Sequence, residues 1–180
     1  LRDMLSSELP DMRFKASAVL AMRGVNEGVP ELQKFVEERS EDKPEGRKTV
    51  SMWQAAIPFL GMAGDKKAVP TLIGVLEDKE ANLDALIAAV RALGRIGDSD
   101  AVPALRKLLE RDDLPTQRTF QVSTGGVQPV VEDAKWQIDL AVAEVLSELG
   151  APDEEVQKIS KPYFNDERIY VRRYAKRVTE

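Results

Sequence analysis

The residues of this chain that could carry out chemistry are charged ones, because it contains neither His nor Cys. The commonest general base, the commonest zinc ligand and the thiolate nucleophile are therefore missing. Arg91 and Arg95, spaced as one helical turn, could together hold an anion, and Glu144 and Glu148, spaced in the same way, could transfer protons. No phosphate-binding loop, nucleophile elbow or cluster of metal ligands accompanies them. We therefore expect a protein that is not an enzyme and that needs no cofactor or metal.

The helix expected over residues 83–96 would position Arg91 and Arg95. Its apolar residues recur at intervals of three and four, which places them on one face of an α-helix. That face comprises Ala85, Ala88, Ala89, Ala92, Leu93 and Ile96. Asp84 joins the two arginines on one narrow polar stripe. The pattern predicts a helix that packs closely against its neighbours through alanines and exposes a single charged stripe.

The phrase Gly-x-x-x-x-Val-Pro-x-Leu recurs along the chain and separates its helices. It occupies residues 24–32, 64–72 and 97–105, and a degraded copy begins at Gly150. Gly is typical just after the end of a helix, and Pro is typical of the first helical turn. Each copy therefore predicts the end of one helix and the beginning of another, and such repetition indicates a helical solenoid.

Each repeat is expected to consist of two helices, and the second helices of successive repeats can be aligned on their last residue. The aligned segments are residues 12–20, 52–60, 85–93, 138–146 and 171–179, which gives spacings of 40, 33, 53 and 33 residues. A unit of 33 residues with insertions of 7 and 20 residues accounts for all four spacings. The insertions fall in the turn between first and second helix, near residues 40–48 and 112–133.

Two segments of the central repeats carry a family resemblance, residues 85–98 (ALIAAVRALGRIGD) and 97–110 (GDSDAVPALRKLLE). They resemble the short bacterial HEAT repeat, the type named after phycobilisome lyases, and VRRYA at residues 171–175 also matches. The resemblance implies an all-α protein of the armadillo type, a right-handed α-α superhelix (a HEAT-like solenoid) of about five helical hairpins. It implies one repeat domain with units at approximately 1–24, 25–64, 65–97, 98–150 and 151–180. Because the chain begins at Leu1 without an initiator Met, we expect a fragment of a longer protein.

The insertion at residues 112–133 has the pattern of a small β-hairpin. Phe120 and Val122 alternate with polar residues, and Gly125 and Gly126 suit a tight turn. Pro129 favours a position at a sheet edge. The alternative is a surface loop without regular structure.

In solenoids of this type, as the resemblance implies, the second helices line a concave surface. The charged stripe of residues 83–96 indicates which positions face it, and the same register in the other repeats gives a candidate concave binding surface. This surface comprises Phe14, Gln54, Met62, Asp84, Ile87, Arg91, Arg95, Leu140, Glu144 and Arg173. Apolar groups exposed among charges suit a peptide or an amphipathic helix. The alternative is that these apolar residues pack against neighbouring repeats.

One position on that surface holds charges of alternating sign, namely Arg91, Glu144 and Arg177 in successive units. We interpret it as a ladder of ion pairs between repeats, and the alternative is an anion site formed by Arg91 and Arg95. Trp53 and Trp136 each open a second helix, where a large aromatic residue packs against the next repeat or stacks on a ligand.

The last helix, residues 166–180, is rich in arginine and tyrosine. Such a helix could bind nucleic acid or an acidic partner. It is also the terminal unit, however, and a terminal repeat needs a polar outer face, so we favour a capping role.

Composition and family together favour a non-enzymatic scaffold that binds a protein or peptide. The net charge of −5 argues against nucleic acid, because phosphate binding needs clustered cations. Two alternatives come from the resemblance, a bilin lyase-like factor that attaches chromophores and a HEAT-like DNA-binding protein or glycosylase. No membrane span or signal peptide is visible, so we expect a soluble protein and favour the cytoplasm.

Overall fold

The computed structural model describes residues 1–39, 51–120 and 130–180. Within these residues, nine α-helices, five short 3-10 helices and one two-stranded sheet follow one another along the chain. The α-helices are α1 (Pro10–Met22), α2 (Val29–Glu37), α3 (Met52–Ala63), α4 (Val69–Glu77), α5 (Leu83–Ile96), α6 (Val102–Leu109), α7 (Lys135–Glu148), α8 (Asp153–Ser160) and α9 (Ile169–Val178). The prediction of an all-α solenoid with a small β insertion is confirmed.

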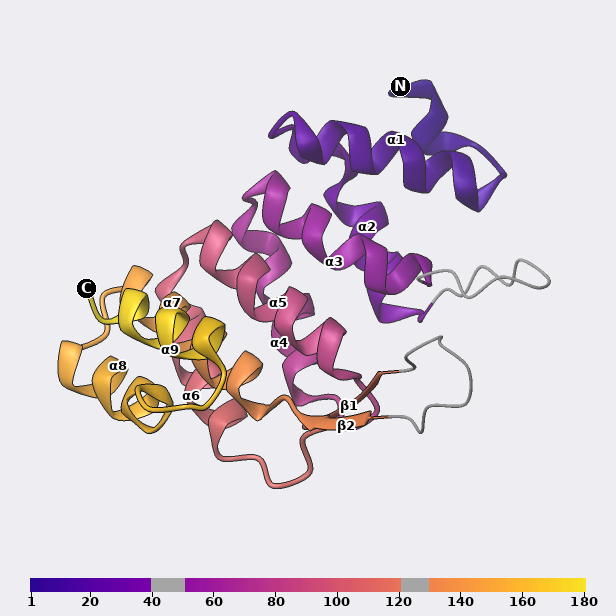
Figure 1. Cartoon of the computed structure of the whole chain (residues 1–180). Helices are drawn as coiled ribbons and strands as arrows, with labels where there is room; N and C mark the ends of the chain where they lie inside the picture. Colours follow the sequence, from indigo (N-terminus) through magenta and orange to yellow (C-terminus); the bar gives the residue numbers. More distant parts are fainter. Residues whose placement is uncertain (40–50, 121–129) are drawn as a thin grey trace.

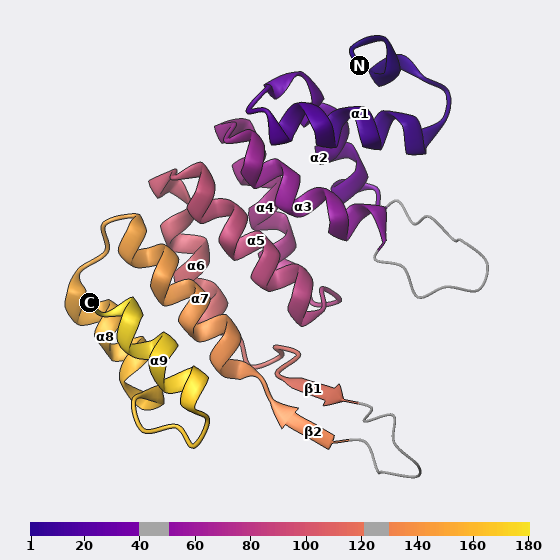
Figure 2. The same ribbon diagram turned by 45° about the horizontal axis from the view of Figure 1, so that its top comes forward.

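The helices form two layers that run the length of the molecule (Figure 1). Figure 2 shows the longer helices α1, α3, α5, α7 and α9 side by side in chain order, with the shorter α2, α4, α6 and α8 behind them. Each short helix leads into the long helix that follows it, so the chain folds as stacked helical pairs. A helix that buries one face against its own pair and its neighbours needs only local contacts, which explains the repeating sequence.

The repeated phrase forms the connection between pairs, and its residues take the same roles each time. Gly24, Gly64, Gly97 and Gly150 all have a positive φ, between 67° and 82°, which ends the preceding long helix at little steric cost. In the three complete copies a short 3-10 helix follows (Asn26–Gly28, Lys66–Ala68 and Ser99–Ala101). Val and Pro then occupy the first two positions of the next short helix, where the missing N–H of Pro has no helical partner to lose.

The core consists of the alanine-rich faces of the long helices and the leucines of the short ones. Ala89, Leu93 and Leu105 are fully buried. At Gly61 the backbone of α3 comes so close to α5 that an added Cβ atom would lie 2.6 Å from the Cα of Ala92. Small residues at helical spacing therefore set how closely successive pairs approach.

Several polar contacts between repeats lie on the layer of short helices. Lys107 on α6 pairs with Glu77 on α4 at 2.8 Å, and Arg106 pairs with Glu155 on α8 at 2.7 Å. On α2, Gln33 donates a hydrogen bond to the hydroxyl of Thr71 on α4, at 2.9 Å. Contacts between successive units therefore occur among the short helices, in addition to the contacts that the sequence predicted among the long ones.

The predicted hairpin is present as β1 (Gln117–Phe120) and β2 (Val130–Asp133), which pair antiparallel between α6 and α7. The register sets Arg118 opposite Glu132 and Thr119 opposite Val131. The proposed glycine turn, together with Val122 and Pro129, lies outside the described residues, as does the whole of the other insertion at residues 40–48.

Candidate binding pocket

A pocket of about 350 Å³ lies where the hairpin meets the long helices α5, α7 and α9. Its lining residues come from four elements of the chain: Asp84, Ile87, Ala88 and Arg91 from α5, Arg118 from β1, Trp136 and Gln137 from α7, and Tyr174 from α9. It therefore spans three helical pairs and the insertion. The combination of two guanidinium groups, two aromatic rings and an apolar floor suits a ligand with both charged and apolar parts.

The two arginines of the pocket differ in their partners. Arg118 forms an ion pair with Asp84, whose side chain is 76% exposed. Arg91 is exposed, and it forms no ion pair within 4.0 Å with an acidic residue of the described ranges. The sequence suggested that Arg91 would act with Arg95, but the residue that shares the pocket with it is Arg118.

Tyr174 separates Arg91 from Glu144. Its hydroxyl donates a hydrogen bond to one carboxylate oxygen of Glu144 at 2.6 Å, and Arg177 donates to the other oxygen at 2.8 Å. Burial, reinforced by the bond to Glu144, raises the pKa of Tyr174 to about 12, so its hydroxyl stays protonated near neutral pH. The predicted ladder is correct for Glu144 and Arg177 and wrong for Arg91, because the tyrosine takes the place of the second cation.

Trp136 connects the pocket to the end of the solenoid. Its ring lies 5.6 Å from that of Tyr170, measured between centroids, and the guanidinium of Arg168 lies 5.7 Å from its centre. The indole N–H is buried and has no acceptor among the described residues. The interpretation of Trp136 as a packing residue is consistent with these contacts, yet the same residue also lines the pocket.

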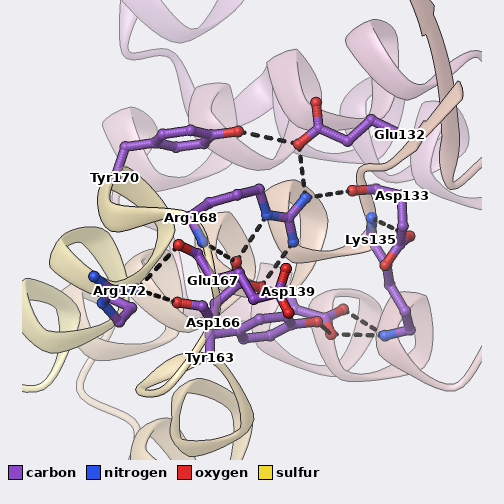
Figure 3. Close-up of polar contacts among 10 residues, drawn as sticks. All are labelled: Glu132, Asp133, Lys135, Asp139, Tyr163, Asp166, Glu167, Arg168, Tyr170 and Arg172. Atoms are coloured by element: carbon purple, nitrogen blue, oxygen red, sulfur yellow. Dashed lines mark hydrogen bonds and ion pairs between the residues drawn. The ribbon is translucent and has the colours of Figure 1, made fainter. Parts of the chain in front are cut away.

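Arg168 holds the base of the hairpin against the start of α9 (Figure 3). One of its nitrogens donates to Glu132 at 2.7 Å and to the carbonyl of Asp133 at 2.8 Å, and its other two bind Asp166 at 2.8 Å each. This bidentate pair lowers the pKa of Asp166 to about 2. Tyr170 also donates to Glu132, at 3.0 Å, so β2 is fixed to the last helical pair by two side chains.

A second group of polar side chains supports α7 beneath this contact (Figure 3). Asp139, which is buried, accepts hydrogen bonds from Tyr163 at 2.6 Å and from Lys135 at 2.7 Å. Burial, followed by the bond to Asp139, raises the pKa of Tyr163 well above its usual value. Because every charged group of the cluster is paired, we read it as the support of the pocket and the hairpin rather than as a catalytic centre.

The predicted binding residues are only partly brought together. Asp84, Ile87 and Arg91 line the pocket, and Glu144 contacts it through Tyr174. Arg95, Arg173 and Met62 are exposed but do not line the pocket, and Gln54 is half-buried. Phe14 packs edge-on against Phe35 and Phe59, at the margin of the core.

Leu140 is a correction, because it is fully buried and cannot belong to any binding surface. It packs with Val171 and Ala175 of α9, and Tyr174 packs against this cluster. The register taken from the charged stripe of α5 placed Leu140 and Ile87 outward, but Ile87 is itself buried at 8% exposure, and on α7 the helix α9 covers this face. Sequence reasoning missed Arg118 and Tyr174, and their only signal was their position in the insertion and in the tyrosine-rich last helix.

Within the described ranges, no helix is long and apolar enough to cross a membrane, and no group of acidic residues could hold a metal ion.

Comparisons with known proteins agree with the architecture. Residues 50–121 match the family model of HEAT repeats. A chain from the complex of CpcE and CpcF of phycocyanin lyase from Nostoc sp. PCC7120 has a similar structure, with a TM-score of 0.65 and 26% sequence identity. The similarity covers 98% of this chain and 61% of that chain, so this chain spans about three fifths of the other's length. No curated protein matches the sequence significantly. The two-layer stack of helical pairs, its repeated connection and these similarities together support a HEAT-repeat protein.

Proposed function

We propose that this chain is a binding scaffold that holds a segment of a partner protein in the pocket between α5, α7, α9 and the hairpin. The observation that carries the proposal is the construction of the pocket. Residues distant in sequence supply cations, aromatic rings and apolar surface to one hollow, while the paired polar residues around Arg168 and Asp139 hold its walls in place. Preorganised walls favour binding because few side chains need to be ordered when the partner arrives.

The similarity to a phycocyanin lyase chain supports the same idea at a coarser level. That chain was determined in a complex of two proteins, so a repeat array of this kind can serve as a subunit that contacts another protein. Exposed apolar side chains also lie near the pocket, since Val131 on β2 and Ile169 and Tyr170 on α9 are each more than half exposed. Apolar groups of this kind are typical of surfaces that bind proteins.

The test is selection of phage-displayed random dodecapeptides against the purified chain and against an Ala88→Trp variant. Ala88 lines the pocket on α5 and is half-buried at the margin of the core, so a large ring at this position should fill the pocket, and urea unfolding of the variant checks that the core is intact. We expect peptides that bind the original chain and lose most of their affinity for the variant. Peptides that bind both proteins equally, or the absence of any selected sequence, would contradict the proposed site.

A second function is favoured by one observation, the similarity to a chain of a phycocyanin lyase. We propose as the alternative that this chain is a subunit of a bilin lyase-like factor that attaches a chromophore to another protein. Mixing the chain with a bilin and an apo-phycobiliprotein should then shift the absorbance of the bilin. An unchanged spectrum, both for the chain alone and in the presence of a second HEAT-repeat subunit, would count against this alternative.

A further inference from the structure

We infer that the pocket recognises a carboxylate on an otherwise apolar peptide segment, through the guanidinium groups of Arg91 and Arg118. This inference rests on the proposed function and names the class of segment that the scaffold takes. The two arginines come from different elements, α5 and the hairpin, and both line the same hollow. Both guanidinium groups can donate to a ligand in this hollow, and the planar guanidinium of arginine matches the geometry of a carboxylate.

The two arginines are available to a ligand to different degrees. Arg91 forms no ion pair with an acidic residue of the described chain, and the acidic group nearest in the predicted register, Glu144, is already bound by Tyr174 and Arg177. Arg118 is paired with Asp84, but that carboxylate is 76% exposed. Exposed pairs contribute only about 0–1 kcal/mol, so an incoming carboxylate can share or replace this partner at little cost.

The charges around the pocket favour a carboxylate over phosphate or nucleic acid. Asp84 lines the pocket and Glu144 lies just behind Tyr174, and both repel a doubly charged or polymeric anion. The chain as a whole also has a net charge of −5. A single carboxylate needs only local donors, whereas a nucleic acid needs a continuous basic surface.

The remaining lining defines what should lie next to the carboxylate. Ala88 and Trp136, with a small part of Ile87, form the apolar part of the lining. An apolar or aromatic residue beside the acidic one would cover this area, and a central apolar contact ringed by charge is typical of peptide recognition. The hairpin sets the position of Arg118, because its paired residue Glu132 is held by Arg168.

The experiment uses the dodecapeptide selection and then one selected peptide, resynthesised and titrated by calorimetry. We expect the selected sequences to be enriched in Asp or Glu beside an apolar residue. Arg91→Gln and Arg118→Gln should each weaken binding about tenfold or more, as expected for loss of a charged hydrogen bond. Replacing the acidic residue of the peptide by its amide should have a similar effect.

Two further variants sharpen the test. Arg95→Gln is the matched control, since it removes an exposed arginine from the same helix that does not line the pocket; it should leave affinity unchanged. Asp84→Asn removes the competing partner of Arg118 and should strengthen binding several-fold.

Each outcome has a distinct meaning. The inference would be overturned if the selected peptides fail to bind Ala88→Trp but lack acidic residues, or if they bind Arg91→Gln and Arg118→Gln as tightly as the original chain. The scaffold function would still stand in that case. If no peptide depends on the pocket, the scaffold function and the inference both fail.

Discussion

The seam between α3 and α5 and the seam between α7 and α9 join neighbouring repeats in different ways. In the first, Gly61 lies directly against Ala92, and the space between the two backbones is too small for an added Cβ atom. In the second, Leu140 is covered by Val171 and Ala175, with the rings of Trp136 and Tyr174 at its margin. Large rings take more room than alanines, and the pocket lies beside them. The comparison shows that one repeat pattern can give a closed seam or a more open one with a pocket at its margin, depending on side-chain size.

The largest expected effect concerns the second seam. Leu140→Ala removes a fully buried side chain beneath α9 and should lower the free energy of unfolding by about 2–5 kcal/mol. Met62→Ala is the control, because Met62 is 42% exposed on another long helix and should cost much less. Urea unfolding measures both. Equal losses would mean that α9 does not cover α7 in solution.

At the first seam, a larger side chain rather than a smaller one should lower the stability of the fold. Gly61→Ala adds a methyl group where the neighbouring backbone leaves no space, whereas Gly74→Ala adds one on α4 where no atom lies within 4 Å. Both changes bring the same gain in helix propensity, so the difference between the two variants isolates the close contact. We expect Gly61→Ala to be less stable than Gly74→Ala by about 1–3 kcal/mol. Thermal and urea unfolding of the pair would detect it, and equal stability would contradict the tight seam.

The hairpin contact should show a dependence on pH. Asp166 has a pKa of about 2 in the folded chain, below its usual 3.8, so the pair with Arg168 stabilises the fold above about pH 4 and is lost as pH falls toward 2. Arg168→Gln should cost about 1 kcal/mol near pH 6, and this difference from the original chain should shrink as pH falls through that window. Comparing the two proteins cancels the titration of the other carboxylates. A difference that stays constant from pH 6 to pH 2.5 would mean that Asp166 does not depend on Arg168.

The packing of the first seam could be predicted from the sequence, and the packing of the second could not. Ala89 and Ala92 recur at helical spacing, and such a pattern is local, so the face it buries follows from the helix alone. Leu140 aligns with Ile87, a position that the register placed outward, and its burial depends on how α9 lies across α7, which no local pattern contains. The position of Arg118 depends in turn on the contact of Glu132 in the hairpin with Arg168, and these two residues are 36 positions apart along the chain. The division into five units with the stated boundaries stays a prediction.

The smallest expected effect concerns the charges beside the pocket. A double-mutant cycle of Glu144→Arg with Arg177→Glu reverses a pair that lies at 2.8 Å, with Arg177 66% exposed, so a coupling of about 0.5–1 kcal/mol is expected. The matched cycle of Glu144→Arg with Arg91→Glu should give a smaller coupling, because Tyr174 occupies the oxygen of Glu144 that Arg91 would need. Urea unfolding of the single and double variants gives both values. Should the Arg91 cycle show the larger coupling, the ladder predicted from the sequence would be right and Arg91 would be committed to the fold. A small coupling would instead leave its guanidinium available to the carboxylate of a bound segment, and the open seam would then differ from the closed one in function as well as in packing.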